Sequence, residues 1–394
     1  MSAPQPPLNH LLTEPGEYPF VTLEKKVKAL APADRKLIHF GIGDPREQTP
    51  AFIRDTVRAA IPEVSSYPTV AGDPRLRAAI AGWYQRRFGV TLDPETHVLP
   101  ANGTKEAVYL LAFALISRDG GDPRHTVVIP SPAYPVYEQG ARFAGADIHF
   151  TPLRREDGWR FDPSRVSEEV WAKTALLWLN DPHNPTGSVL DAAAYDKVMA
   201  VARRFGFWVA GDHAYDELWF DAAKMPRSIL QHGFENAIAF HTLSKRSAMT
   251  GYRSGFMAGD PRLIAALRRF RPSVGVATPE FVQAGAIAAW SDDAHTAVLR
   301  QRYAAKRTRF LEYFARRGWK VEASEATFYL WMRVPDGDDV GFAERLIRAG
   351  VVATPGSYLG SGGEGFIRWA LVPTLAECEE ALTRLDAVAD TVAR

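Results

Sequence analysis

A serine, a lysine and an arginine follow one run of apolar residues and could together bind a phosphorylated ligand. The run covers residues 237–243 and predicts a buried strand; Ser244 and Lys245 come directly after it, and Arg253 follows a short loop. A hydroxyl and a guanidinium suit a phosphate group, since arginine can offer it two parallel hydrogen bonds. A lysine that is partly desolvated beside another cation loses basicity and becomes a nucleophile that forms Schiff bases with carbonyl compounds. These residues therefore predict a site for a phosphorylated aldehyde attached to Lys245.

Pyridoxal phosphate (PLP) is an aldehyde of this kind, and two stretches elsewhere could hold its phosphate and one face of its ring. Gly103 and Thr104 lie where a predicted strand ends and a helix begins, so free backbone N–H groups and a hydroxyl are available to a phosphate. Tyr134 stands between prolines and could stack on a pyridine ring. An ordinary capped helix start and a loop tyrosine packed on the surface are the competing interpretations.

Three polar side chains after two other predicted strands could contact the edges of the PLP ring. Asn184 lies in Asn-Pro-Thr-Gly, where turn-forming residues would fix its amide, and Asp212 and Tyr215 follow the strand at 207–211. A buried carboxylate is costly unless it meets a cation, and a protonated pyridine nitrogen is such a cation. A tight turn at Asn184 and a helix N-cap at Asp212 stay open as alternatives. His183 and His213 are interpreted as polar loop residues, and no metal site is expected, because no histidines stand at metal-ligand spacing.

Arg368 lies within an apolar run at 365–370 that predicts a strand. An arginine in such a run needs an anion, and the α-carboxylate of an amino-acid substrate is a natural candidate. An internal salt bridge would satisfy the same charge. For the far end of a substrate, the sequence offers Arg46, Arg142 and Lys105 among many cations and does not distinguish between them.

The elements that position these residues alternate between strand and helix over much of the chain. Strands are predicted at 97–100, 126–130, 147–151, 174–180, 207–211, 237–243 and 255–258, and helices at 105–116, 134–144, 192–204 and 261–270. Several strands are continuous apolar runs, which indicates burial on both faces in a mainly parallel sheet covered by helices. A long helical region at 279–314 follows, and the mixed strands and helices after it predict a second, smaller α+β domain.

The composition narrows the class of protein. The chain has 47 basic and 46 acidic residues, and this balance gives no electrostatic reason to expect nucleic acid or a membrane surface as a partner. A single cysteine excludes an intrachain disulfide framework and fits a reducing compartment. No signal peptide or transmembrane run is recognisable. We therefore expect a cytoplasmic protein.

Taken in order, the motifs resemble those of the class I/II, fold-type-I PLP-dependent aminotransferases. The motifs are residues 102–105, Tyr134, residues 184–187, Asp212 with Tyr215, and Ser244-Lys245 with Arg253. The resemblance implies a large PLP-binding domain at 52–290 with a mostly parallel seven-stranded sheet, and a small α+β domain formed by 37–51 and 291–394. An N-terminal arm and short helix would occupy residues 1–36. The family also implies a homodimer with shared active sites.

The same resemblance assigns roles to individual residues. Lys245 would hold PLP and carry protons, with Asp212 on the ring nitrogen and Tyr215 and Asn184 on the ring oxygen. The residues matched to the cofactor are Gly103, Thr104, Lys105, Tyr134, Asn184, Asp212, Tyr215, Ser244, Lys245 and Arg253, together with Tyr67 for the phosphate in the neighbouring subunit. The residues matched to the substrate are Gly43, Asn184 and Arg368.

Three segments are similar to the succinyldiaminopimelate aminotransferases of bacterial lysine biosynthesis. They are residues 241–247, which include Arg246, and residues 328–331 and 355–359; Tyr252 and Ala133 depart from that pattern. The expected reaction moves an amino group between glutamate or 2-oxoglutarate and N-succinyl-LL-2,6-diaminopimelate. An aminotransferase for aspartate, aromatic or other amino acids, or a PLP-dependent C–S β-lyase, stays open as an alternative. A PLP-binding regulatory module would need a DNA-binding domain or a basic surface, and the sequence offers neither.

Overall fold

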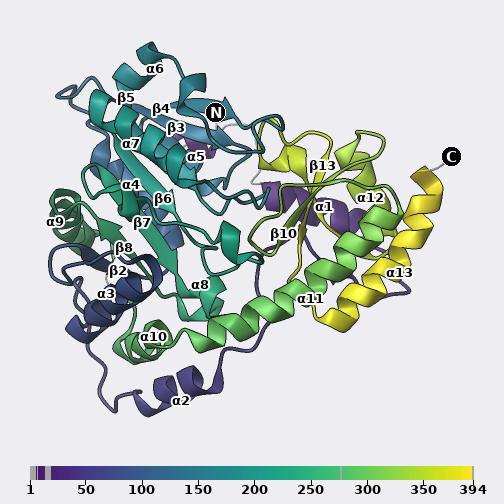
Figure 1. Cartoon of the computed structure of the whole chain (residues 1–394), viewed down its shortest axis with the longest axis horizontal. Helices are drawn as coiled ribbons and strands as arrows, with labels where there is room; N and C mark the ends of the chain where they lie inside the picture. Colours follow the sequence, from purple (N-terminus) through teal and green to yellow (C-terminus); the bar gives the residue numbers. More distant parts are fainter. Residues whose placement is uncertain (1–5, 7, 14–18, 276, 393–394) are drawn as a thin grey trace.

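The chain is organised around a seven-stranded sheet in a computed structural model that describes residues 6, 8–13, 19–275 and 277–392 (Figure 1). The strand order is β2-β8-β7-β6-β5-β3-β4, in which β8 runs antiparallel to both neighbours and all other adjacent pairs are parallel. The strands are β2 (Val98–Ala101), β3 (Thr126–Ser131), β4 (Asp147–Pro152), β5 (Thr174–Asn180), β6 (Trp208–Asp212), β7 (Ala237–Thr242) and β8 (Gly255–Gly259). The predicted sheet is confirmed.

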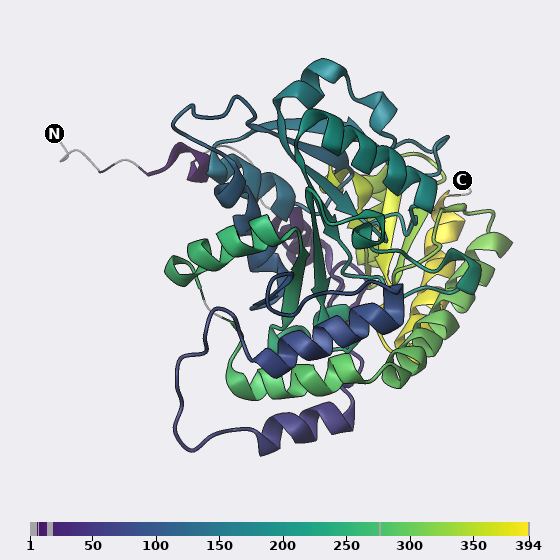
Figure 2. The ribbon, with the colours of Figure 1, turned by 60° about the vertical axis from the view of Figure 1, so that its left-hand side comes forward.

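Helices cover both faces of this sheet (Figures 1 and 2). In β5, Leu176 and Trp178 join one hydrophobic core, while Leu177 and Leu179 join the core on the opposite face, because successive side chains of a strand alternate. The first core includes residues of α4 (Thr104–Leu115), α5 (Val136–Ala144) and α9 (Pro261–Phe270), and the second those of α3 (Pro74–Phe88), α7 (Ala192–Phe205) and α10 (Glu280–Ser291). The continuous apolar strands of the sequence are thus explained by burial on both faces.

Polar residues stand at the carboxyl ends of three central strands. Asn180 ends β5, Asp212 ends β6 and Thr242 ends β7. These strands are parallel, so their carboxyl ends meet at one edge of the sheet, where ligands of such sheets bind. The short helix α8 (Leu243–Arg246) follows β7 directly and brings Ser244 and Lys245 to the same edge.

A smaller α+β part packs at this edge (Figure 1). It contains an antiparallel sheet in the order β12-β13-β10-β9 and a parallel pair of β1 with β11. Its elements are α1 (Pro19–Leu30), β1 (Ile38–His39), α11 (Ala294–Arg316), β9 (Val321–Glu322), β10 (Tyr329–Arg333), α12 (Asp339–Arg348), β11 (Val351–Val352), β12 (Thr354–Pro355), β13 (Phe366–Ala370) and α13 (Leu375–Val392). The domain limits given above stay predictions, and the arm residues 1–5, 7 and 14–18 lie outside the described residues.

One predicted element differs in its extent. The helical region expected at 279–314 is divided into α10 and α11, because Asp292 adopts an extended backbone conformation with φ −119° and ψ 127°. Its carboxylate Oδ1 then accepts hydrogen bonds from the backbone N and ring Nδ1 of His295 at 3.0 and 2.6 Å. The aspartate thus competes with the helix for backbone donors, as a capping residue does.

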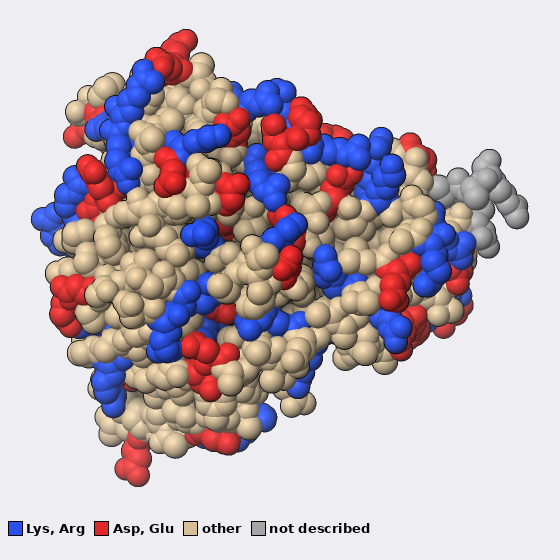
Figure 3. Space-filling view, viewed as in Figure 1, with Lys and Arg blue, Asp and Glu red and all other residues tan. Residues whose placement is uncertain are grey.

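The charged side chains on the surface are mixed in sign. On the face drawn in Figure 3, basic and acidic groups are interspersed over both parts of the molecule. Among the described residues, no helix combines the length and the apolar character that crossing a membrane requires.

Candidate active site

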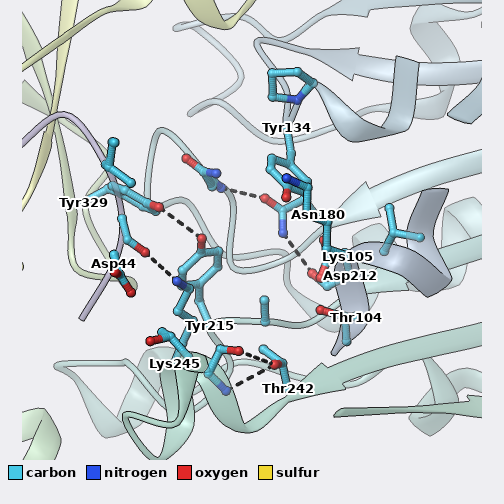
Figure 4. Close-up of a pocket in the computed structure, with 18 of the residues that line it drawn as sticks. Asp44, Thr104, Lys105, Tyr134, Asn180, Asp212, Tyr215, Thr242, Lys245 and Tyr329 are labelled. Carbon is cyan, nitrogen blue, oxygen red and sulfur yellow. Dashed lines mark hydrogen bonds between the residues drawn. The ribbon is translucent and has the colours of Figure 1, made fainter. Parts of the chain in front are cut away.

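A cavity of about 430 Å³ opens between the sheet edge and the smaller α+β part (Figure 4). The predicted site residues that line it are Gly43, Thr104, Lys105, Tyr134, Asn184, Asp212, Tyr215, Ser244, Lys245, Arg253 and Arg368. Of the remaining two, Gly103 lies against the Arg253 side chain. Tyr67 does not line the cavity and is 94% exposed in the loop between α2 (Ala51–Ala59) and α3. The fold therefore brings nearly all of the predicted residues together.

Lys245 projects from α8 into the cavity, where its Nζ donates a hydrogen bond to the carbonyl oxygen of Gly43. Burial lowers the pKa of this lysine to about 8; the Asp44 carboxylate opposes the shift, and the charges of Arg253 and Arg368 add to it. A substantial part of the amine is therefore neutral near pH 8, which nucleophilic attack and proton transfer both require.

Donor groups for a phosphate meet on one side of the cavity. Thr104 begins α4, and Gly103 before it has a φ of 76°, a conformation that glycine adopts without strain. A Cβ on Gly103 would overlap the guanidinium of Arg253, which forms no ion pair with any described residue. The hydroxyl oxygen of Ser244 lies 3.0 Å from that of Thr242, and Ser244 lines the cavity, where its hydroxyl can reach a ligand. A helix N-terminus, a hydroxyl and a guanidinium thus point to an anion site.

Asp212 has one satisfied and one unsatisfied oxygen. Its Oδ2 accepts a hydrogen bond from the Tyr137 hydroxyl at 2.6 Å, whereas its buried Oδ1 has no partner among the described residues. Tyr137 is itself fixed by stacking on Trp178, with ring centroids 4.6 Å apart. Burial raises the pKa of Asp212 to about 6, and the Tyr137 hydrogen bond partly opposes this. An unpartnered buried oxygen is costly and invites a cationic donor from a ligand.

Arg368 is buried, yet it forms no salt bridge within the described part of the chain. Its Nη1 donates to Asn184 Oδ1 at 3.0 Å, and its Nη2 donates to the carbonyl oxygen of Gly41 at 2.6 Å. The internal salt bridge that the sequence left open is therefore not found. Because an arginine side chain can only donate, the group of Asn184 that faces Arg368 must be its amide oxygen. The NH₂ group of Asn184 therefore stays available for another acceptor.

Several cavity residues were not identified from the sequence, among them Asn180, Tyr137 and Tyr329. Asn180 links two strand ends, because its Nδ2 donates to the backbone oxygen of Asp212 at 2.9 Å and its Oδ1 accepts from Asn184 N at 2.7 Å. Its place at the end of an apolar strand was an available signal. Tyr137 stands three residues after Tyr134, a spacing that could have suggested it. Tyr329 comes from β10 of the smaller part, and no local pattern distinguishes it from a core tyrosine.

The two histidines interpreted as polar loop residues are buried inside the protein. His183 Nε2 lies 3.1 Å from the carbonyl oxygen of Pro132. His213 Nδ1 lies 2.8 Å from Asp181 O, and its Nε2 accepts from Ile229 N. Burial lowers the pKa of His183 to about 4 and that of His213 to about 3, so both are neutral structural groups. Within the described residues, no group of three or more His, Cys, Asp or Glu side chains could hold a metal.

Arg246 does not line the cavity, although it neighbours Lys245. Its guanidinium is buried, pairs with Asp293 at 2.8 Å, and lies 5.5 and 4.9 Å from the ring centroids of Trp83 and Trp290. This residue carried part of the likeness to succinyldiaminopimelate aminotransferases. Its environment indicates a structural role rather than contact with a substrate.

The residues of the cavity fit PLP. A lysine of lowered pKa, a buried carboxylate oxygen without a partner in the described chain and a phosphate-sized donor set surround one space. The unsatisfied Asp212 oxygen matches a protonated pyridine nitrogen, and the Arg253 corner matches the phosphate.

Comparison with known proteins agrees with this chemistry. The family model for class I and II aminotransferases matches residues 35–385. An LL-diaminopimelate aminotransferase of Nitratidesulfovibrio vulgaris strain Hildenborough is 36% identical over 375 residues, which cover 93% of this chain and 95% of that protein. The structure of an aminotransferase from Neisseria meningitidis matches with a TM-score of 0.91 and 34% identity, over 97% of this chain and 100% of that one. A probable N-succinyldiaminopimelate aminotransferase from Thermus thermophilus matches with a TM-score of 0.85 and 28% identity, over 94% and 99% of the two chains. The chain therefore belongs to the class I and II aminotransferases, and it is a PLP-dependent enzyme that transfers amino groups between amino acids and 2-oxo acids.

Proposed function

We propose that Lys245, Asp212 and Tyr215 are the catalytic residues of this aminotransferase, and that its amino-acid substrate has the diaminopimelate skeleton. The observation that carries the site is the buried oxygen of Asp212, which has no partner among the described residues and belongs to a residue that lines the same cavity as Lys245. That oxygen needs a cationic donor, and a lysine of lowered pKa needs a carbonyl partner; PLP provides both.

Bound PLP supplies an electron sink that makes the α-hydrogen of an amino acid acidic. Asp212 would keep the ring nitrogen protonated, because its free oxygen can accept that proton's hydrogen bond in a buried site. Lys245 would take the proton from the substrate Cα and deliver it to C4′ of the cofactor, first as a base and then as an acid. Tyr215 would donate its hydroxyl proton to the ring oxygen, together with the NH₂ group of Asn184.

Arg368 would bind the α-carboxylate of the substrate. Its charge is not neutralised by any described carboxylate, and its partners Asn184 and Gly41 leave it without a counter-ion. Gly43 and Asn184 would complete this end of the site. Charge-assisted contact with a guanidinium orients the substrate so that its Cα hydrogen lies beside Lys245.

The phosphate would be held by the start of α4 and by two side chains beyond β7. The residues proposed for the cofactor are Gly103, Thr104, Lys105, Ser244 and Arg253 around the phosphate, with Tyr134 on the ring face. These groups act by position and charge and take no part in proton transfer.

We further propose that two copies of the chain form a homodimer in which Tyr67 reaches the phosphate of the neighbouring subunit. Support comes from its 94% exposure and its place outside its own cavity. A cytoplasmic location belongs to the same proposal, on the basis of the sequence features described above.

The diaminopimelate skeleton is proposed because of the relatives. One is named for LL-diaminopimelate and another for the N-succinyl compound. Glutamate and 2-oxoglutarate would be the second pair of substrates. An aspartate or aromatic aminotransferase, or a C–S β-lyase, is the alternative that the experiment must separate.

A panel of amino donors tests this function. The purified enzyme with PLP and 2-oxoglutarate is offered LL-diaminopimelate, N-succinyl-LL-diaminopimelate, aspartate, phenylalanine and cystathionine, and glutamate formation is measured. We expect kcat/KM to be highest for one of the two diaminopimelate compounds. Turnover of aspartate or phenylalanine, with none of either diaminopimelate compound, would overturn the proposed substrate. Release of pyruvate from cystathionine without formation of glutamate would indicate a C–S β-lyase.

A further inference from the structure

We propose that Tyr329 is a positioning residue of the active site: its hydroxyl donates to Tyr215 and its ring supports the guanidinium of Arg368. The inference rests on the proposed roles of Tyr215 and Arg368. Tyr329 lines the cavity from β10 of the smaller part, whereas Tyr215 follows β6 of the large sheet (Figure 4). One side chain would therefore connect the cofactor side of the site to the substrate side.

The two phenol groups form a hydrogen bond in a buried environment. Their oxygens are 3.1 Å apart, and the residues are 3% and 7% exposed, Tyr329 and Tyr215 respectively. Only one proton can lie between the two oxygens. If Tyr215 donated it, Tyr215 would have no proton left for the ring oxygen of PLP. Donation by Tyr329 leaves the Tyr215 proton free and also strengthens it as a donor, because hydrogen bonds in a chain polarise one another.

The ring of Tyr329 also supports the charge of Arg368. The guanidinium carbon lies 4.6 Å from the ring centroid, and Arg368 is 2% exposed. No acidic side chain among the described residues pairs with this guanidinium. An aromatic face attracts a cation without occupying its N–H groups. Arg368 is thus held in place with its charge still available to a carboxylate.

A third contact places Tyr329 beside the backbone that receives Lys245. A Cβ on Gly43 would overlap the hydroxyl of Tyr329 and approach Phe328, so a larger residue at this position would have to displace the Tyr329 side chain. The carbonyl oxygen of the same Gly43 accepts the hydrogen bond of Lys245. Tyr329 therefore contacts three residues to which the proposed function gives roles, Tyr215, Arg368 and Gly43, from a strand of the smaller part.

Two substitutions separate the hydroxyl from the ring. Tyr329→Phe removes only the hydrogen bond to Tyr215, and Tyr329→Leu removes the hydrogen bond and the aromatic face. Tyr303→Phe is the matched control, since Tyr303 is a buried tyrosine of the same core whose hydroxyl has no partner in the described part of the chain and whose ring packs against Phe328. Tyr215→Phe tests the proposed function on which the inference depends.

The first readout is the pH titration of the absorbance of PLP bound to Lys245. A donor on the ring oxygen disfavours the proton on the nitrogen that joins PLP to the lysine, so removing that donor raises the titration midpoint. Tyr215→Phe should raise it by about 1 pH unit. Tyr329→Phe should raise it by about 0.3 unit, since it removes only the cooperative part. Tyr303→Phe should leave it unchanged.

The second readout is the steady-state kinetics of the amino-acid substrate. Tyr329→Leu should raise KM about fivefold more than Tyr329→Phe does, because only the former removes the ring below Arg368. Thermal unfolding of each variant reports whether it folds.

A shift of the titration midpoint with Tyr215→Phe but none with Tyr329→Phe would overturn the positioning role of Tyr329 and leave the proposed function intact. An unshifted midpoint in Tyr215→Phe would instead contradict the proposed role of Tyr215. Equal KM values for both Tyr329 variants would contradict the proposal that the ring of Tyr329 supports Arg368.

Discussion

Two buried aspartates at neighbouring strand ends share their burial but differ in their partners. Asp212 ends β6, and Asp181 directly follows β5; the backbone N of Asp181 donates to the backbone O of Asp212 at 3.1 Å. Burial raises the pKa of Asp212 to about 6 and that of Asp181 to about 7. The carboxylate of Asp181 is satisfied by Leu190 N at 2.9 Å and the Tyr195 hydroxyl at 2.7 Å. Of these two, Asp212 alone keeps an oxygen without a partner in the described chain.

A third carboxylate in this region behaves as Asp181 does. Asp216 is buried, and its Oδ2 lies 2.8 Å from Nδ1 of His241, whose Nε2 lies 2.6 Å from the Tyr84 hydroxyl. Burial raises the pKa of Asp216 to about 6 as well. A raised pKa therefore does not by itself identify a catalytic carboxylate, since structural networks also produce it. An unsatisfied oxygen in a cavity is the more selective criterion.

The largest effect on activity is expected when the lysine of the cavity is removed. Lys245→Ala should lower transamination by about 10⁴-fold or more, because it removes both the attachment of PLP and the proton carrier. The absorbance of lysine-bound PLP should disappear while the unfolding temperature stays close to that of the wild type. A variant with normal turnover would contradict the proposed role of Lys245.

Asp212→Asn removes the charge and keeps the shape. We expect a loss of about 10²- to 10³-fold in kcat, since the ring nitrogen loses its counter-charge. The apo protein should be no less stable than the wild type, because the substitution removes a buried charge that is only partly satisfied. Kinetics of the holoenzyme and urea unfolding of the apo protein measure the two quantities. An unchanged kcat would refute the claim that Asp212, unlike Asp181, is catalytic.

Asp181→Ala tests the aspartate whose two oxygens both accept hydrogen bonds within the protein. It leaves the Leu190 N–H and the Tyr195 hydroxyl unsatisfied, and we expect a loss of about 3 kcal/mol in the free energy of unfolding. Asp212→Ala, which leaves the Tyr137 hydroxyl without its acceptor, should lose about 1 kcal/mol and serves as the matched control. Should Asp212→Ala prove the more destabilising of the two, the count of partners would not explain the difference.

The sequence predicted the site residues that stand at strand ends. Asp212 ends an apolar strand, and Lys245 and Asn184 follow apolar strands within a few residues. The apolar pattern and the parallel arrangement of the strands therefore predicted all three at one edge of the sheet. Tyr329 and Tyr137 could not be identified in this way, because they reach the cavity from a β-strand of another part and from the first turn of a helix after a loop. Their role depends on side-chain direction, which a single sequence does not specify.

The fold was predicted with similar success and similar gaps. The seven strands of the large sheet were located to within one residue at each end, since each is an apolar run bounded by polar or turn-forming residues. The break between α10 and α11 was missed, although Ser291, Asp292 and Asp293 are the residue types that end and start helices. An apolar pattern that continued on both sides outweighed that local signal.

The pH dependence of stability compares the two aspartates directly. A carboxyl with a raised pKa is protonated in the folded protein before it is in the unfolded chain, so its contribution favours folding at low pH and declines as the pH rises. For Asp212 this contribution is lost between its ordinary pKa of 3.8 and about 6, and for Asp181 the loss extends to about pH 7.

In the apo protein, Asp212→Asn should therefore reduce the fall in stability between about pH 4 and 6, by about 2 kcal/mol across that interval. Asp181→Asn should flatten it up to about pH 7 instead. Urea unfolding at several pH values measures both slopes. Identical slopes in the wild type and Asp212→Asn would mean that the pKa of this carboxyl is not raised in the apo protein, and its free oxygen would then have found a donor in solution.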